Sequence, residues 1–474
     1  MTTQRRHQLT RYVVSDYLAV NLGWLVCSVV RLALTYPGTL TMEMVLRHLV
    51  DGPVVTGQIC IPLMMMALFW ISGYYNNVFF KSRTDELVGT ATSALVGAVL
   101  AYFIVLINDT GQDRLRNYEM LLLLFGCLFV PVYLCRVMIT TRTARRIAGG
   151  HVLFDTLVVG TGMGSVSLAH RVQQGRNHSG FNIVGYVDTT GHGVRDSIDG
   201  LPVYSMEDLD DVVRERHIAR FIIGPQHSGM RDTAAVINRL FAYGCSIYAS
   251  PELGGMVLRR PRMRDVTGEP LHNISEVNIP ASYVNCKRVL DIVVSSLVLL
   301  AISPVMAAVA IAVRRSSPGP VIYSQERVGY HKRPFNIYKF RTMVSDAEQY
   351  GPQLARDDDP RITRVGHFLR KYRLDELPQF WNVLKGDMSI VGPRPEREFY
   401  IRQIVAKAPY YALIHQVRPG ITSWGMVKYG YASTVEDMIK RLQYELLYLE
   451  NISLGVDLRI MFHTIDTVIS GEGL

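Results

Sequence analysis

Apolar residues concentrate in four long stretches in the first third of the chain. They run from about residue 12 to 34, 54 to 74, 87 to 107 and 120 to 139. Each stretch holds about the 20 apolar residues that a helix needs to cross a bilayer. No small-residue cleavage site follows the first stretch, so it does not resemble a signal peptide. Residues 1–146 are therefore predicted to form a bundle of four transmembrane helices.

Basic residues predict the orientation of these spans, because Lys and Arg favour the cytoplasmic ends of short loops. They precede the first span, separate the second from the third, and follow the fourth. They are Arg5, Arg6, Arg11, Lys81, Arg83, Arg136, Arg142, Arg145 and Arg146. These three regions are expected to share the cytoplasmic side, although Arg114 and Arg116 lie in the opposite loop. Asp16 falls within the first span, where a charge is costly, so it should face a neighbouring helix or lie near the interface.

Residues 147–280 alternate between strand-like and helix-like stretches. Buried strands are predicted at about 155–159, 183–188, 221–224 and 246–249. This alternation is typical of a doubly wound parallel sheet, and we interpret the block as an α/β Rossmann-like domain.

A glycine-rich turn follows the first of these strands. Gly160, Gly162 and Gly164 give G-x-G-x-G, and Ser165 stands where the dinucleotide-binding fingerprint has its third glycine. Asp188 ends the next predicted strand, at about the distance of a ribose-binding acid. We prefer a vestigial or regulatory pocket here, with dinucleotide binding through the three glycines as the alternative.

A fifth apolar segment, 289–313, decides the topology of everything after it. Basic pairs flank it at 287–288 and 314–315, which favours both ends on the cytoplasmic side. Pro304 removes a backbone donor and kinks a helix, and the hydroxyl of Ser303 can satisfy the backbone nearby. We predict a re-entrant membrane helix over 287–315, broken at Ser303 and Pro304. An ordinary kinked span is the alternative.

The last part of the chain, 281–474, is predicted to be an α/β catalytic domain associated with the membrane through this helix. After the helix it is polar, basic and irregular, and it ends in two amphipathic stretches at about 435–450 and 456–469. These stretches could lie in the membrane interface or pack on the core of the domain.

Composition and charge indicate which classes of binding partner to expect. The chain has 474 residues, enough for two or three domains, and its mean hydropathy of +0.14 is high for a soluble protein. The net charge of +9 favours an anionic partner such as nucleic acid, anionic lipid or a phosphorylated substrate. We expect no nucleic acid, because the basic residues lie beside membrane segments and form no binding motif. The six cysteines lack metal-type or disulfide-type spacing, so we expect them to serve packing.

Two adjacent carboxylates, Asp375 and Glu376, stand among many basic residues. Adjacent helical residues point about 100° apart, so the two can have different roles. One can attack phosphorus as a covalent acceptor, while the other holds a metal or orients a proton. Mg²⁺ suits such a site, because it needs only one or two protein carboxylates besides phosphate oxygens. Alone, an Asp-Glu pair is most often a solvated helix face, but its basic neighbours favour phosphoryl chemistry.

Basic side chains near the pair are candidates for substrate binding. Arg394 lies between two prolines that restrict the backbone, and a preset guanidinium suits bidentate recognition of phosphate. An exposed arginine in a turn is the alternative. Lys339 and Arg341 fall on a predicted strand, 335–343, whose alternation puts both on one face. Weaker candidates for contacts to phosphate or base are Gln325, Arg327 and Arg361.

These motifs occur together in a known family. From about Lys287 onward the chain resembles the bacterial polyprenyl-phosphate sugar-1-phosphate transferases, also called monotopic phosphoglycosyl transferases. The matching stretches are 287–291, 303–304, 338–343, 359–363, 374–378, 386–389, 391–395 and 418–425. The four spans and the Rossmann-like domain resemble the large subfamily, whose members start exopolysaccharide, capsule and lipopolysaccharide O-antigen repeat units.

The resemblance implies a mechanism. Asp375 would attack the β-phosphorus of a UDP-sugar and release UMP, and undecaprenyl phosphate would then take the phosphosugar from the enzyme. It implies that Glu376 binds Mg²⁺ or assists proton handling and that Arg394 holds a phosphate. It also implies a homodimer held in membrane lipids of the bacterial inner membrane, with the catalytic domain on the cytoplasmic face. Glucose and galactose are the usual sugars.

The chain departs from the family pattern at two places, and two other functions are alternatives to the transferase. Ser165 leaves cofactor binding in doubt, whereas Tyr372 and Arg373, where many relatives carry Thr-Ser, should cost no activity. A membrane-bound nucleotide-sugar dehydratase or epimerase would also join four spans to a Rossmann fold, but we find no convincing Tyr-x-x-x-Lys pair. A non-catalytic scaffold of polysaccharide assembly is the second alternative, and the intact Asp375-Glu376 pair speaks against it.

Overall fold

The computed structural model describes residues 3–38, 40–79, 81, 83–106, 114–174, 180–189, 196–225, 230–250, 271–274, 279–344, 347, 351, 359–430 and 432–470. The chain divides into two compact units. The first comprises Met1–Val152 and Pro280–Cys286, and the second comprises Leu153–Ile279 and Lys287–Leu474. The three predicted domains, with boundaries at 146 and 280, stay a prediction.

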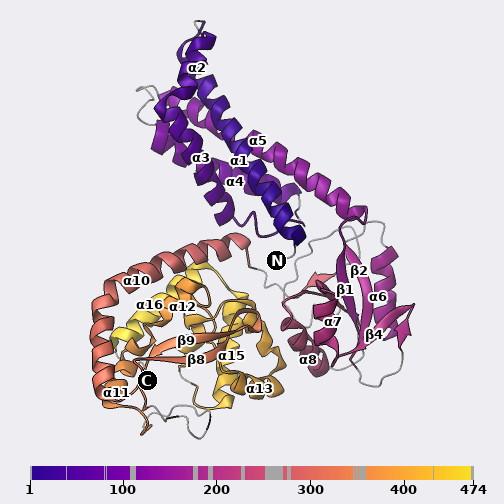
Figure 1. The fold of residues 1–474 in the computed structure, drawn as a ribbon, viewed down its shortest axis with the longest axis vertical. Coiled ribbons are helices and arrows are strands. Elements are labelled where there is room, and N and C mark those ends of the chain that lie inside the picture. The colour runs from indigo at the N-terminus through magenta and orange to yellow at the C-terminus, as the bar shows by residue number, and fades with distance from the viewer. Residues whose placement is uncertain are drawn as a thin grey trace. The chain divides into compact units, whose positions relative to one another are not determined.

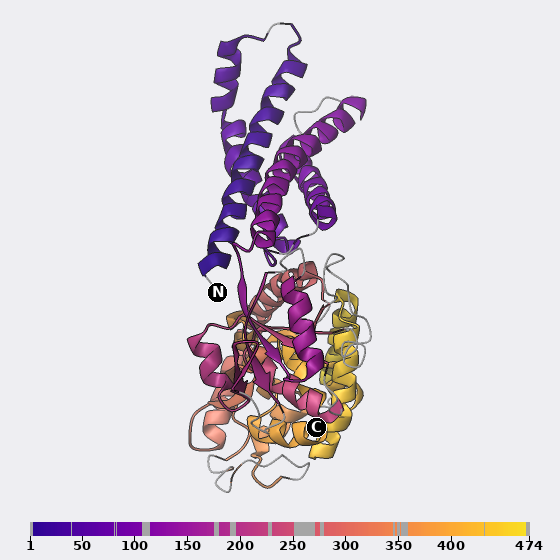
Figure 2. The ribbon, with the colours of Figure 1, turned by 90° about the vertical axis from the view of Figure 1, so that its right-hand side faces the viewer.

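Long helices that run alongside one another build the first unit (Figure 2). They are α1 (Thr3–Thr35), α2 (Met42–Val50), α3 (Gly52–Ile71), α4 (Arg83–Ala101) with its π-helical continuation η1 (Tyr102–Leu106), and α5 (Arg114–Ala148). Four of these helices, together with the later helix Ala281–Ser316, are long and apolar enough to cross a membrane. They overlap the four predicted stretches, although α3 ends at Ile71, before the predicted end at 74, and residue 107 lies outside the described residues. These helices indicate a membrane protein. The short helix α2 was not predicted.

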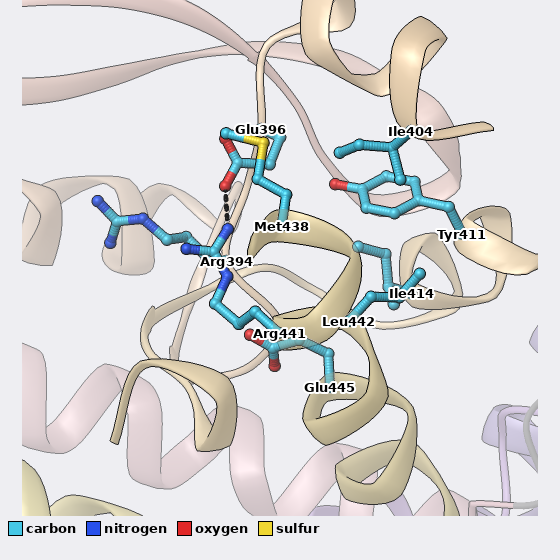
Figure 3. A pocket seen from close by; sticks show the side chains of 9 residues that line it. All are labelled: Arg394, Glu396, Ile404, Tyr411, Ile414, Met438, Arg441, Leu442 and Glu445. Atoms are coloured by element: carbon cyan, nitrogen blue, oxygen red, sulfur yellow. Dashed lines mark hydrogen bonds and ion pairs between the residues drawn. The ribbon is translucent and has the colours of Figure 1, made fainter. Parts of the chain in front are cut away.

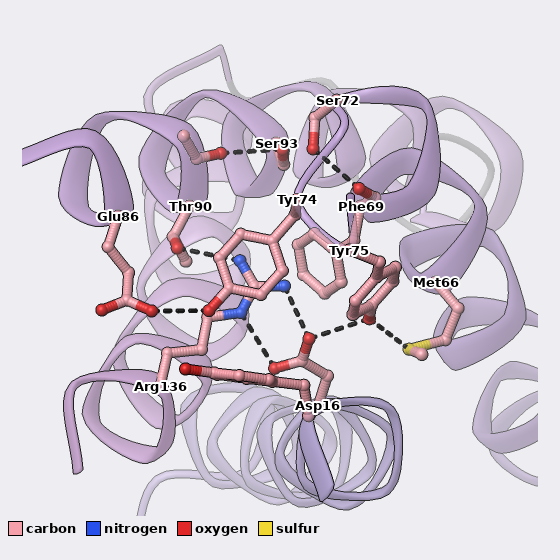
Figure 4. Close-up of polar contacts among 12 residues, drawn as sticks. Asp16, Met66, Phe69, Ser72, Tyr74, Tyr75, Glu86, Thr90, Ser93 and Arg136 are labelled. Carbon is pink, nitrogen blue, oxygen red and sulfur yellow. Dashed lines mark hydrogen bonds and ion pairs between the residues drawn. The ribbon is translucent and has the colours of Figure 1, made fainter. Parts of the chain in front are cut away.

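A buried ion pair joins α1 to α5 inside this unit (Figure 4). Asp16 and Arg136 are both fully buried, and the Nε and Nη2 atoms of Arg136 donate to the two carboxylate oxygens of Asp16 at 2.9 and 2.7 Å. The hydroxyl of Tyr75 donates to the same carboxylate at 2.8 Å. Asp16 therefore faces a neighbouring helix, which was one of the two predicted placements. Counting Arg136 among the loop cations was wrong, because its charge is matched by Asp16 inside the bundle.

A seven-stranded sheet forms the first part of the second unit (Figure 1). Its strands are β1 (Phe154–Val159), β2 (Phe181–Asp188), β3 (Ser197–Ile198), β4 (Leu201–Ser205), β5 (Arg220–Ile223), β6 (Ser246–Ala249) and β7 (His272–Asn273). Their spatial order is β3-β4-β2-β1-β5-β6-β7, and the five strands from β4 to β6 are parallel. The helices between them are α6 (Met163–Gln174), α7 (Leu209–Glu215) and α8 (Met230–Phe241). All four predicted strands are present.

Both faces of this sheet are covered, which explains why its strands are continuous apolar runs. Leu157 and Val159 pack in one hydrophobic cluster, and Val158 packs in another. Successive residues of a strand point to opposite faces, so the two clusters lie on opposite sides of the sheet.

The glycine-rich turn after β1 has the backbone that its sequence requires. Gly160 has a φ of 111°, which favours glycine, and a Cβ added at Gly162 would meet open space. Ser165 packs against Gly224, where an added Cβ would lie 2.1 Å from the Ser165 hydroxyl oxygen. A glycine at the end of β5 thus accommodates the serine that replaces the third glycine. Binding of a dinucleotide here stays a prediction.

One continuous helix, α10 (Ala281–Ser316), contains the fifth apolar segment. Figure 1 shows that its ribbon bends sharply between two straighter parts. Pro304 lies inside the helix, and the hydroxyl of Ser303 donates to the carbonyl oxygen of Leu300 at 2.9 Å. Proline and serine are usual causes of a helix bend. The helix is therefore continuous through Ser303 and Pro304, where a break was predicted.

The rest of the second unit is less irregular than predicted. It consists of β8 (Ile322–Val328), η2 (Tyr330–Lys332), β9 (Pro334–Phe340), α11 (Arg364–Lys371), η3 (Leu374–Glu376), α12 (Gln379–Lys385), β10 (Ser389–Val391), α13 (Glu398–Lys407), η4 (Pro409–Gln416), β11 (Gly420–Thr422), α14 (Trp424–Lys428), α15 (Val435–Glu450) and α16 (Leu454–Ser470). β8 and β9 form an antiparallel hairpin, and β10 pairs in parallel with β11. Helix α16 buries Ile460 in the core and leaves Leu458, Phe462 and Ile465 exposed.

Candidate functional site

Asp375 and Glu376 lie on η3, a single turn of 3₁₀ helix between α11 and α12. Arg373 immediately before it has a φ of 52°, a left-handed conformation that costs a non-glycine residue about 1–3 kcal/mol. Leu374 and Leu377 on either side of the pair pack against the hydrophobic cluster that α10 forms with β9 and α11. Successive residues of a 3₁₀ helix point about 120° apart, so the two carboxylates face different surroundings.

Glu376 holds the ion pairs of this site. Its Oε1 atom accepts from Lys339 Nζ at 2.6 Å and lies 3.5 Å from Nη2 of Arg394. The predicted alternative, an exposed arginine in a turn, does not describe Arg394, whose side chain is only 17% exposed. Asp375 is in no ion pair among the residues that the structure describes, although it is nearly as buried as Glu376. The structure thus gives the two neighbouring acids different partners.

The different surroundings shift the pKa values of the two acids in opposite directions. Burial raises the pKa of Asp375 to about 6, with Lys339 opposing the rise and the Glu376 charge adding to it. Burial alone would also raise the pKa of Glu376, but Lys339 and Arg394 outweigh it and hold that pKa well below its usual range. Glu376 is therefore ionised throughout the physiological pH range, while the pKa of Asp375 lies close to neutral pH. Such divided pairs are typical of acids with separate catalytic roles.

Of the basic residues predicted for substrate binding, Lys339 and Arg394 form ion pairs with Glu376. β9 ends at Phe340, so the strand alternation stops before Arg341. The guanidinium of Arg341 instead donates to the carbonyl oxygen of Ser317 at 2.6 Å, just beyond the end of α10. Arg361 pairs with Asp359 at 2.5 Å, within its own loop.

Gln325 and Arg327 lie together on β8. Nη2 of Arg327 donates to Oε1 of Gln325 at 2.7 Å, and Nη1 of Arg327 lies 3.2 Å from both the carbonyl oxygen of Pro395 and a carboxylate oxygen of Glu396. Arg327 therefore supports the segment that follows Arg394, rather than lying beside the acidic pair. A role of Gln325 in binding a base stays a prediction.

The sequence reasoning missed a buried charged cluster behind Arg394. Glu396, Arg441 and Glu445 are each 5% exposed or less. A signal for two of them was present, because Arg441 and Glu445 are charged residues four apart on the otherwise apolar stripe of α15. Glu396 gave no signal, since it follows Pro395 in a loop.

The described residues include no group of three or more His, Cys, Asp or Glu side chains that could hold a metal by themselves. The acidic pair offers carboxylate oxygens only. Mg²⁺ needs one or two such carboxylates when the phosphates of a substrate supply further oxygens, so the residues present fit this metal.

Comparison with known proteins identifies the family of this chain. Residues 282–471 match the family model described as bacterial sugar transferase. A UDP-glucose:undecaprenyl-phosphate glucose-1-phosphate transferase from Caulobacter vibrioides is 40% identical over 190 residues, which are 39% of this chain and 70% of that protein. This chain belongs to the bacterial sugar transferase family. The resemblance inferred from the motifs is thereby confirmed.

Two further members of the family are similar over different shares of the chain. A UDP-N-acetylgalactosamine-undecaprenyl-phosphate N-acetylgalactosaminephosphotransferase from Aeromonas hydrophila is 46% identical over 191 residues, 40% of this chain and 45% of that protein. A UDP-glucose:undecaprenyl-phosphate glucose-1-phosphate transferase from Escherichia coli is 37% identical over 292 residues, 60% of this chain and 61% of that protein. The chain thus spans about half to three fifths of these two relatives.

Proposed function

We propose that this member of the family is a membrane enzyme that transfers a sugar-1-phosphate from a UDP-sugar to undecaprenyl phosphate. One observation carries the proposal. A buried Asp-Glu pair lies beside Lys339 and Arg394 in the region that matches the family, and the pKa values of the two acids are shifted in opposite directions. The named activities of the relatives agree with it. The product would start a repeat unit of exopolysaccharide, capsule or O-antigen.

Asp375 is the nucleophile in this proposal. One of its carboxylate oxygens attacks the β-phosphorus, the bond from that phosphorus to the bridging oxygen breaks, and UMP leaves. A phosphate oxygen of undecaprenyl phosphate then attacks the same phosphorus and releases the Asp375 carboxylate. Burial raises the pKa of Asp375, whereas Lys339 and Arg394 lower that of Glu376, so the more basic carboxylate of Asp375 is the stronger nucleophile of the two.

The neighbouring charges stabilise the phosphates. Lys339 carries positive charge that would compensate the negative charge developing on the transferred group. Glu376, with Asp375 beside it, would hold Mg²⁺, which when bound neutralises charge on the diphosphate oxygens. Arg394 would bind one of the phosphates in the bidentate manner that a guanidinium allows.

The finer architecture belongs to the same proposal. The four long apolar helices of the first unit would form a four-span bundle in the bacterial inner membrane. The order β4-β2-β1-β5-β6 within the large sheet supports a Rossmann-like domain. The bend in α10, with basic residues at Lys287-Arg288 and Arg314-Arg315, supports a re-entrant helix that returns the catalytic part to the cytoplasmic face.

Cysteine labelling tests this topology. In a variant without native cysteines, Ser433→Cys after α10 should resist a membrane-impermeant maleimide in intact cells, as should His151→Cys. Met42→Cys, at an exposed position between the first two apolar helices, should react. Labelling of the cysteine at 433 in intact cells would establish an ordinary span and refute the re-entrant helix.

Turnover should depend on the ionisation of Asp375. Its pKa is raised above the usual value of 3.8 to about 6, so the nucleophile becomes neutral as the pH falls through 6. Formation of the phosphosugar enzyme should therefore decline with one proton below that pH. The measurement is the burst of UMP released in the absence of undecaprenyl phosphate. The lipid phosphate is left out because it is a phosphate monoester, which itself titrates at about pH 6. A burst rate that is constant from about pH 5 to about pH 8 would contradict the assignment.

Replacing Arg394 by alanine should weaken use of the nucleotide sugar more than it slows chemistry. Removing a charge-assisted hydrogen bond to phosphate costs enough to lower kcat/KM by about 10- to 100-fold. We expect this loss chiefly as a higher KM for the UDP-sugar, measured by UMP release. Arg402→Ala, at an exposed arginine of α13, is the matched control and should behave as wild type. A pure kcat effect in Arg394→Ala would assign the guanidinium to the transition state instead.

The decisive assay is UMP release by the purified protein with Mg²⁺ and undecaprenyl phosphate. The donor panel should include UDP-glucose, UDP-galactose and UDP-N-acetylgalactosamine, because the relatives use more than one sugar. Release with one donor, dependent on the lipid phosphate, would establish the reaction and the sugar together. Lack of release with every donor would favour the scaffold function.

A further inference from the structure

Helix α15 carries two charged residues on the face that it buries. Arg441 and Glu445 are 5% and 3% exposed, and they stand among apolar neighbours such as Met438, Leu442 and Tyr448. Burying charge costs free energy unless the group is paired and hydrogen-bonded. A pair of apolar residues would fill this face at lower cost, so the contacts of the two charged side chains indicate what they are for.

Glu445 contacts the start of α14. Its Oε1 atom accepts a hydrogen bond from the Ser423 hydroxyl at 2.6 Å, and that hydroxyl oxygen in turn accepts from the backbone N–H of Met426 at 3.0 Å. Ser423 is thus the N-cap of α14, and Glu445 fixes the cap. A Cβ added at Gly425 would lie 2.6 Å from Oε1 of Glu445, so α15 packs directly on the backbone of α14 here.

The same short helix supports Arg394. Nη1 of Arg394 lies 3.0 Å from the sulfur of Met426, and Nη2 lies 3.5 Å from Oε1 of Glu376. Contacts therefore run without interruption from Glu445 through Ser423 and α14 to Arg394, and from Arg394 to the acidic pair.

Arg441 pairs with Glu396, which follows Arg394 in the chain (Figure 3). Its Nη2 atom donates to Oε1 of Glu396 at 2.5 Å, and the other carboxylate oxygen of Glu396 lies 3.2 Å from Arg327. Glu396 comes two residues after Arg394, with Pro395 between them. Helix α15 is thus linked to the segment that carries Arg394 directly through Arg441 and Glu396, and indirectly through Glu445, Ser423 and α14.

Burying the carboxyl group of Glu445 in this position costs free energy. Burial raises its pKa to about 7, with Ser423, Arg441 and Arg394 opposing the rise. Its second oxygen, Oε2, and the hydroxyl of Tyr411 have no hydrogen-bond partner among the described residues, and both side chains line the cavity drawn in Figure 3. Unsatisfied buried polar groups are uncommon in folded proteins and ask for an explanation.

We propose that Glu445 is a positioning residue, which holds Arg394 toward Glu376 by fixing the N-cap of α14. The inference deepens the proposed function, on which it rests for the role of Arg394 in binding the UDP-sugar. Glu445 itself does not touch substrate in this proposal, and its effect on turnover passes through Arg394.

The test compares Glu445→Ala, Glu445→Gln and the control Glu450→Ala in the full-length protein. Glu450 lies on the same helix and is exposed. Loss of the acceptor in Glu445→Ala should raise the KM for the UDP-sugar and lower kcat/KM by about 10- to 100-fold, the cost of a group displaced by about 1 Å. Glu445→Gln keeps an oxygen for Ser423 and should stay within about threefold of wild type. Glu450→Ala should have no effect.

A double mutant separates positioning from a general loss of folding. If Glu445 acts through Arg394, then Glu445→Ala should cause little further loss in the Arg394→Ala background, because coupled residues are not additive. Full additivity of the two losses would overturn the proposal. So would equal activity of Glu445→Ala and wild type.

A readout without turnover distinguishes failure of this inference from failure of the proposed function. Phenylglyoxal modifies accessible arginines, and mass spectrometry can follow its reaction at Arg394 alone. In Glu445→Ala, but not in Glu445→Gln or Glu450→Ala, Arg394 should react faster than in wild type. An unchanged rate at Arg394 in Glu445→Ala would refute the positioning role, even if no UDP-sugar proves to be a donor.

Discussion

Asp375→Asn should abolish turnover. The asparagine keeps the size of the side chain but cannot form the acyl phosphate, so both steps of the proposed double displacement lose their nucleophile. Removal of a catalytic nucleophile in other enzymes lowers kcat by about 10⁴-fold to 10⁶-fold, and we expect a loss in that range. UMP release with the accepted donor is the measurement. Intact-mass analysis should also find a phosphosugar adduct on wild type and none on the variant.

Asp466→Asn is the matched control for this experiment. Asp466 is an exposed aspartate of α16, so the same substitution there should leave turnover unchanged. An Asp375→Asn enzyme with wild-type activity would exclude the covalent mechanism. An inactive variant that has also lost its folded structure would be replaced by Asp375→Glu, which retains a carboxylate but moves it.

The second large effect should be on stability. Asp16→Asn would leave the guanidinium of Arg136 in the interior of the first unit without its bidentate counter-charge. Breaking one side of a buried ion pair costs about 3–5 kcal/mol. We therefore expect a clearly lower midpoint of thermal unfolding for the purified protein in detergent.

Two further variants sharpen the interpretation. Glu43→Gln breaks an ion pair with Arg47 that is largely exposed, and it should cost about 0.5 kcal/mol or less. Replacing both Asp16 and Arg136 by leucine removes the two charges together and should recover part of the stability lost in Asp16→Asn. If Asp16→Asn unfolds at the same temperature as wild type, the ion pair does not hold α1 against α5.

The sequence by itself determined the periodic parts of this protein. Apolar stretches of membrane length predicted the four long helices of the first unit, and short apolar runs between helix-like stretches predicted β1, β2, β5 and β6. The motif around Asp375 and Glu376 predicted the family. These features follow from local composition and spacing, which are present in the chain before it folds.

Only the tertiary structure decided which charges meet. Lys339 and Arg341 are two residues apart and were predicted as equals, yet Lys339 meets Glu376 while Arg341 binds the carbonyl oxygen of Ser317. The strand ends between them, and strand ends depend on packing rather than on alternation alone.

The same holds for the partners of Asp16, Glu376 and Arg394. Arg136 lies 120 residues from Asp16, and α15 follows Arg394 by about one tenth of the chain. No local pattern links such positions. Their pairing arises because a buried charge must find an opposite charge or a hydrogen bond somewhere in the folded interior, and the packing of helices determines which one is within reach.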